Sequence, residues 1–167
     1  HVLNDGRAVT LERSLDDTVA QLGPDGRAYR RLLQPFVRRF DALAEMFLGP
    51  LRVPSSPILF ARFGLVALRS MCGLAASRFS AAPARALLAG ISSHGMLPLD
   101  ALTSSSFALL LGSAGHAVGW PIARGGSQAI ADALVACLRA HGGELVCDRP
   151  VQNLDELPRA RAYVLDV

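Results

Sequence analysis

The stretch that decides the predicted fold is GWPIARGGSQ, residues 119–128, because it leads directly into a helical pattern. Apolar residues repeat at helical spacing over 130–138, and Gly142-Gly143 end the pattern. The glycine pair 125–126 allows backbone to approach a bulky neighbour closely, and Ser127 is a suitable N-cap. The segment therefore predicts a strand, a glycine turn and a helix in succession.

The order of motifs around this helix resembles that of FAD-dependent oxidoreductases of the phytoene dehydrogenase-like and amine oxidase-like superfamily. In that family a Gly-Gly-Ser segment opens a helix like the one expected over 127–141. A Gly-Gly-x-Leu element follows, as at 142–145, and then a Pro-Val-x-x-Leu strand, as at 150–154. Further matching pieces are Asp5-Gly6-Arg7, Ser14 to Gly23, Arg62 to Leu65, Ala84 to Gly90 and His94 to Asp100.

This resemblance implies FAD as the cofactor of the complete protein and an apolar small molecule as its substrate. It implies that the backbone of Val151 holds the adenine edge, a role that requires only an extended residue with free N–H and C=O groups. It also implies that Gly125, Gly126 and Ser127 approach the flavin. Considered without the resemblance, the same glycines and serine are favoured as an ordinary capped helix start.

Four residues are candidates for lining the substrate cavity: His94, His116, Trp120 and Arg124. Either histidine has a suitable pKa for proton transfer, but a histidine near a helix end more often has a structural role. Flavin chemistry draws mainly on the cofactor, and no G-x-S-x-G nucleophile motif occurs. The sequence therefore assigns no catalytic residue.

The predicted fold class is α+β, a helix-dominated domain with a small mixed or antiparallel sheet, as part of a larger FAD-linked two-domain oxidoreductase. No G-x-G-x-x-G fingerprint occurs, whereas relatives carry one near their start. We therefore expect an internal fragment: a substrate-side domain over 1–149, and the return into the FAD-binding domain over 150–167. Such a fragment is expected to bind FAD weakly without the remainder of that domain.

Within residues 1–149 the pattern predicts a hairpin over 1–13, helices over 14–115, a strand and helix over 116–142, and a strand over 143–149. The hairpin is expected to turn at Asp5-Gly6, and Ser14 to cap the first helix. The expected helices include a long one over 25–48, kinked at Pro35, and others over 58–74, 81–93 and 100–112.

Composition excludes several classes of protein. The chain is 51% hydrophobic, its net charge is +3, and its 17 cationic residues are all arginines. These arginines are spread along the chain and aromatics make up 6%, so nucleic-acid binding is not expected. Three scattered cysteines exclude a disulfide framework and a zinc site, and indicate a cytoplasmic protein. The uncharged stretch 101–123 is too polar for a membrane span, while a peripheral membrane contact stays open.

A second interpretation belongs to a different class. The chain is then a self-sufficient helical binding module for a hydrophobic ligand or a protein partner, without a redox role. A strand–G-x-G-x-x-G–helix unit upstream of His1 in the same gene would favour the oxidoreductase. A natural start near His1 would favour the binding module.

Overall fold

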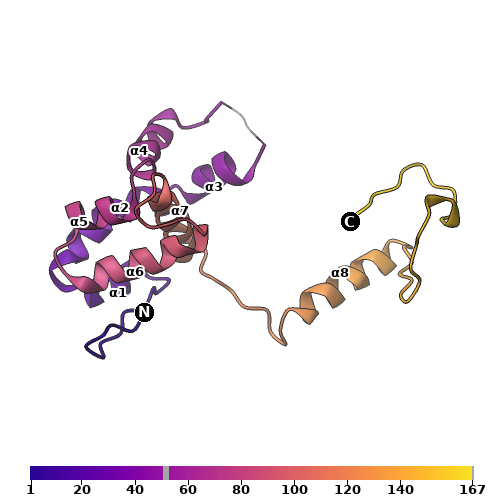
Figure 1. Ribbon diagram of the computed structural model, residues 1–167, viewed down its shortest axis with the longest axis horizontal. Helices are drawn as coiled ribbons and strands as arrows, with labels where there is room; N and C mark the ends of the chain where they lie inside the picture. The colour runs from indigo at the N-terminus through magenta and orange to yellow at the C-terminus, as the bar shows by residue number, and fades with distance from the viewer. Residues whose placement is uncertain (51–52, 167) are drawn as a thin grey trace. The chain divides into compact units, whose positions relative to one another are not determined.

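The computed structural model describes residues 1–50 and 53–166 and divides the chain into two units. Unit 1 is His1–Trp120 and unit 2 is Pro121–Val167. The helices of unit 1 are α1 (Leu15–Gln21), α2 (Gly26–Val37), α3 (Phe40–Leu48), α4 (Pro57–Ala67), α5 (Met71–Arg78), α6 (Ala82–Ser92) and α7 (Ser104–Ala117), with the 3₁₀ turns Gly23–Asp25 and Ser93–Gly95. Unit 2 contains α8 (Gln128–Ala140) and the 3₁₀ turn Leu154–Glu156 (Figure 1).

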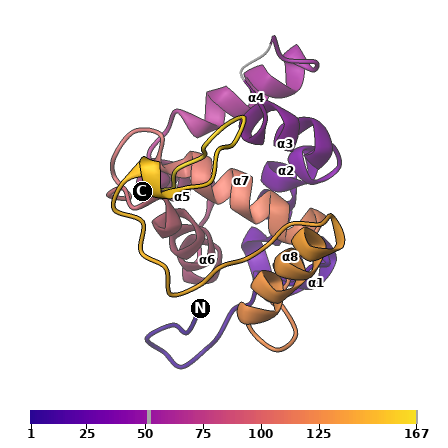
Figure 2. The same ribbon diagram turned by 90° about the vertical axis from the view of Figure 1, so that its right-hand side faces the viewer.

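Helix α7 is the central element of unit 1. It packs against α6, α2 and α4, and Figure 2 shows it passing through the middle of this unit. Ala108 and Leu109 on α7 are completely buried, and Leu33 and Ile91 close over the buried Gly112 from α2 and α6. Unit 1 therefore has one core, built around α7.

The serines that open α7 bond to the backbone at the ends of its neighbours. Ser104 Oγ accepts a hydrogen bond from the N–H of Met71, at the start of α5, over 2.8 Å. Ser105 Oγ donates to the carbonyls of Val66 and Arg69, over 2.8 and 2.9 Å, at the end of α4. Both serines are fully buried. Because helix ends leave backbone groups unpaired, these hydroxyls make the α4–α5 corner compatible with burial.

The predicted sheet is absent, and the α+β assignment is wrong for the part of the chain that the structure describes. The hairpin turn does form: Gly6 has φ +81° and the N–H of Leu3 donates to Arg7 O. However, the only pairing beyond it is a single antiparallel bridge between Val2 and Ala8. A two-stranded ribbon without further strands or a packed face is marginal, which explains why the pairing does not extend.

The strands predicted over 116–122 and 143–149 do not form either. Residues up to Ala117 continue α7, and the chain after it is irregular. Gly119 ends the helix: its φ is +83°, and its N–H donates to Ala114 O over 3.1 Å. The pattern was misread because an apolar, glycine-rich helix end has no alternation that separates it from a strand.

Several predicted helices are shorter than expected. The helix over 25–48 is interrupted at Arg38-Arg39, after Pro35 rather than at it, so that Phe36 and Leu43 both reach the core. The helix over 58–74 is two helices bent by 96° at residues 68–70. The helix expected over 100–112 begins only at Ser104 and continues to Ala117, whereas the capping of α1 by Ser14 is confirmed.

Among the described residues of unit 2, none is buried. The apolar side chains of Ile130, Leu134 and Leu138 on α8 are 56%, 66% and 42% exposed. The side chain of Cys137, on the same helix, is exposed as well. Within unit 2 the amphipathic face of α8 thus has no surface to pack against.

Among the described helices, no single one combines the length and hydropathy of a membrane span; α4 and α5 satisfy both only when taken together across their sharp bend.

We expect Ser104→Ala to destabilise unit 1 by about 1–3 kcal/mol, because it leaves the buried N–H of Met71 without an acceptor. Urea unfolding followed by helical circular dichroism measures the effect. Ser106→Ala is the matched control, since the hydroxyl of Ser106 only donates to Thr103 O near solvent. Equal stability of the two variants would contradict the role given to Ser104.

Candidate functional site

An apolar groove with a volume of about 710 Å³ lies between α5 and α6 in unit 1. Small side chains create it, because alanines on both helices leave the space that larger residues would fill. Its lining residues are Met71, Cys72, Ala75, Ala76, Ser80, Ala82, Arg85, Ala86, Ala89 and Leu99. We call this hollow the alanine groove.

A buried carboxylate holds the turn that joins the two helices of the alanine groove. Asp25, at the start of α2, is 4% exposed. Its oxygens accept hydrogen bonds from Ser80 N–H (2.8 Å), Ser80 Oγ (2.9 Å) and Ala81 N–H (2.7 Å). The backbone N–H groups just before α6 are thereby satisfied by a residue more than fifty positions earlier, so Asp25 determines where α6 begins.

The environment of Asp25 acts on its pKa in two directions. Burial raises the pKa, because it disfavours the charged form. The hydrogen bonds from Ser80 and Ala81, together with the positive charge of Arg85, lower it further than burial raises it. The pKa is therefore below its ordinary value of 3.8, and the carboxylate is ionised at neutral pH.

The end of the alanine groove away from the α5–α6 turn is closed by backbone, whereas Arg85 lies at the turn itself. The N–H of Cys72 donates to Leu99 O over 3.0 Å, which ties the start of α5 to the segment before α7. The guanidinium of Arg85 donates to Phe79 O from Nε over 2.9 Å. Arg85 is therefore held at the α5–α6 turn and brings the only formal charge to a groove lined mainly by apolar atoms.

A second polar feature lies in the core beside α7. The hydroxyl of Tyr29 and Nε2 of His116 are 2.9 Å apart, with the rings edge to face. Both side chains are buried; burial lowers the pKa of His116 and raises that of Tyr29. His116 Nδ1 and Ser113 Oγ have no hydrogen-bond partner among the described atoms. The neutral imidazole is thus the favoured form, and the pair joins α2 to α7.

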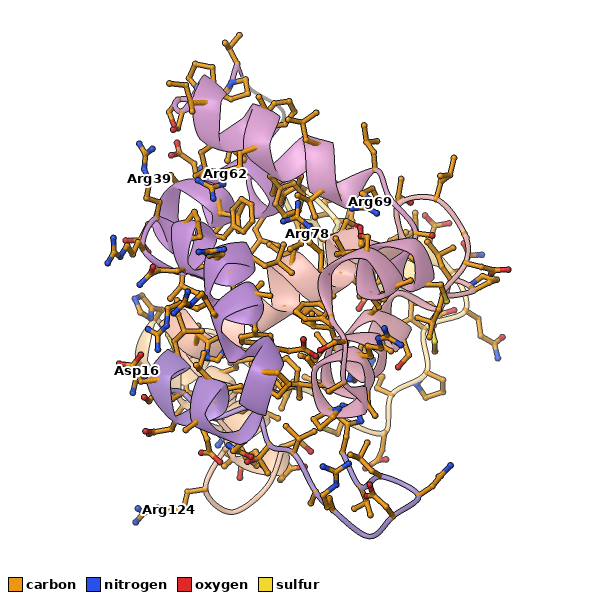
Figure 3. The ribbon with its side chains drawn as sticks, turned by 90° about the vertical axis from the view of Figure 1, so that its left-hand side faces the viewer. Asp16, Arg39, Arg62, Arg69, Arg78 and Arg124 are labelled. Atoms are coloured by element: carbon orange, nitrogen blue, oxygen red, sulfur yellow. The ribbon has the colours of Figure 1, made fainter. Side chains whose placement is uncertain are left out.

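The structure places the predicted substrate-cavity residues apart from the alanine groove. His94 and Trp120 lie edge to face with ring centres 6.1 Å apart, and His116 is buried against Tyr29. Arg124 belongs to unit 2, where its side chain is exposed (Figure 3). None of the four lines the alanine groove.

The predicted cofactor-binding residues all belong to unit 2. Gly125 and Gly126 have φ values of +85° and +88°, and both are exposed. Ser127 precedes α8 but its side chain makes no capping bond. Val151 lies in an irregular exposed segment, and no hydrogen bond among the described residues uses its backbone N–H or C=O. These backbone groups are therefore available to a ligand.

Sequence reasoning missed the alanine groove and Asp25. A signal for the groove exists: Ala82, Ala86 and Ala89 recur at helical spacing, which places small residues along one face of α6. Nothing in the sequence indicates that Asp25 reaches Ser80. Among the described residues, no group of three His, Cys, Asp or Glu side chains is arranged to hold a metal ion.

Asp25→Asn is expected to lower the free energy of unfolding by about 1.5–3 kcal/mol. The asparagine amide has a single acceptor oxygen, so one of the N–H groups that the carboxylate now accepts would face the amide N–H₂ instead. A folded-state pKa below the unfolded value means that this stabilisation is complete above pH 3.8 and is lost as pH falls through the folded-state pKa. Urea midpoints measured from neutral to acidic pH test this. The difference in urea midpoint between the wild type and Asp25→Asn should become smaller at acidic pH. The control Asp17→Asn, at an exposed position, should have nearly the same urea midpoint as the wild type at every pH.

No family model, curated protein or solved structure matches this chain. The resemblance to FAD-dependent oxidoreductases therefore rests on the order of the sequence motifs alone.

Proposed function

We propose that this chain is the substrate-side part of an FAD-dependent oxidoreductase of the phytoene dehydrogenase-like type, and that it binds an apolar substrate in the alanine groove. The groove supports the part of this proposal that concerns binding of an apolar substrate. Its volume of about 710 Å³ lies within the roughly 300–1,000 Å³ of small-molecule sites, and its lining is mostly alanine, methionine and leucine. An apolar substrate would displace water from these surfaces, which is the main source of affinity in such a site.

When bound, FAD would accept a hydride from the substrate; this chemistry belongs to the cofactor. The residues of this chain would contribute binding and orientation. Gly125 and Gly126 support such a role because their positive φ values are strained for any residue with a side chain. Val151 supports it because its backbone N–H and C=O are free to pair with an adenine edge.

The exposed apolar face of α8 also supports a place in a larger protein. An amphipathic helix gains most of its stability from packing that face against another element. Ile130, Leu134 and Leu138 form such a face, and all three are exposed within unit 2. In this proposal they pack against the remainder of the FAD-binding domain.

The alternative function is a binding module for a hydrophobic ligand without a redox role. The alanine groove favours it as much as it favours the oxidoreductase, because the groove accounts for ligand binding alone. The two functions differ in flavin binding, so a titration with FAD separates them.

Filling the alanine groove with a larger side chain should weaken the binding of an apolar ligand. Ala86→Phe is expected to place a ring in the groove and to reduce the binding of an apolar fluorescent probe such as anilinonaphthalene sulfonate by about 10-fold or more. Ala20→Phe, on the exposed surface of α1, adds the same ring outside the groove. Equal probe binding by the two variants would remove the groove as the site.

Flavin binding by the full-length protein tests the role of Val151. Val151→Ala keeps the backbone N–H and should retain FAD, whereas Val151→Pro lacks it and should weaken binding by about 10-fold. Quenching of flavin fluorescence during titration gives both affinities. The 167-residue chain alone should show no saturable binding. A full-length protein that binds no flavin would favour the binding module, and equal affinity of the two variants would contradict the role of Val151.

A further inference from the structure

Four arginines of unit 1 line a second hollow, with a volume of about 250 Å³. Arg31 comes from α2, Arg62 from α4, Arg69 from the α4–α5 corner and Arg78 from the end of α5. Figure 3 shows Arg62, Arg69 and Arg78 on the same face of this unit. The remaining lining residues are apolar: Leu32, Phe36, Leu65 and Val66. We call this hollow the arginine pocket.

Among the described residues, no carboxylate pairs with an arginine of the arginine pocket. Residues 26–40 and 46–99 contain no aspartate or glutamate, so α2, α4 and α5 are all without acidic side chains. Among the described residues, ion pairs join Arg7 to Asp5 and Arg30 to Asp16, and neither involves a pocket arginine. Four guanidinium groups around one hollow repel one another. A bound anion would offset this repulsion, because it attracts each of the four positive charges.

One of the four arginines is held in place by the fold. Arg69 is half-buried, and its Nη2 donates to Gly73 O over 3.0 Å and to Ser77 Oγ over 2.8 Å. Its own carbonyl accepts from Ser105 Oγ over 2.9 Å. Nε and Nη1 have no partner among the described atoms. A donor that is already ordered loses less entropy when it binds a ligand.

We propose that the arginine pocket binds a phosphate or diphosphate group, and that this site is separate from the alanine groove and independent of the flavin proposal. Guanidinium groups pair with phosphate through parallel N–H···O bonds, which makes arginine the preferred residue for such sites. A hollow of about 250 Å³ equals roughly eight water volumes, enough for a diphosphate. The apolar floor, which includes Phe36 and Leu32, would contact the uncharged part of a phosphate-bearing molecule.

Pyrophosphate binding to the chain, measured by calorimetry, tests this proposal. Arg62→Gln/Arg78→Gln is expected to weaken binding by about 10-fold or more, because it removes two charged donors whose side chains are exposed and not needed for packing. Arg139→Gln/Arg161→Gln removes the same charge from exposed positions in unit 2 and should leave the affinity unchanged. Equal weakening in both double variants would overturn the proposal.

Chemical protection of the wild-type chain gives a second readout that does not depend on the folding of a variant. Phenylglyoxal modifies accessible arginines, and mass spectrometry locates the adducts. Pyrophosphate should protect Arg62 and Arg78 but not Arg139. Protection of all three, or of none, would contradict a specific site.

The source of the phosphate is distinguished with vesicles. Sedimentation with phosphatidylcholine vesicles that contain phosphatidic acid, abolished by Arg62→Gln/Arg78→Gln, would assign the site to a lipid headgroup. Binding of free pyrophosphate without sedimentation would assign it to a soluble phosphate compound. If the wild-type chain does not bind pyrophosphate and does not sediment with the vesicles, the proposal is overturned.

Discussion

The arrangement of unit 1 depends on the buried hydroxyls at the start of α7. Ser104 accepts the N–H of Met71 at the start of α5, which has no other acceptor among the described residues, and Ser105 adds a donor for the carbonyls of Val66 and Arg69 at the end of α4. An unpaired backbone group in a core costs about 1–3 kcal/mol, so a sharp bend is stable there only because these bonds exist. The direction of α5 after the bend, and the position of Arg69 at it, follow from them.

Helix α5 contributes to both candidate sites. Met71, Ala75 and Ala76 line the alanine groove, and Arg78 lines the arginine pocket. Asp25 fixes the other wall of the groove, because its carboxylate accepts the N–H groups that precede α6. A buried, hydrogen-bonded carboxylate is costly to disrupt, so the spacing of α5 and α6 is well determined. The groove thus stays open because its two helices are held from outside it.

The two units differ in how far their own residues stabilise them. Unit 1 buries a continuous core around α7, with Tyr29, Phe36 and Leu109 among its members. Unit 2 buries none of its described residues, although α8 has an apolar face. The residues proposed to contact FAD all lie in unit 2.

The sequence by itself determined the helical content, the cap at Ser14, the turn at Gly6 and the helix that follows the glycine pair. Each of these depends on neighbouring residues, and so local patterns predict them. Only the tertiary structure decided that α7 continues through His116, that no sheet forms, and that Asp25 meets Ser80. It also brought Arg31 of α2 next to Arg62, Arg69 and Arg78, which belong to a later part of the chain. The physical reason is that hydrogen bonds and charges between distant segments depend on packing, which no local periodicity contains.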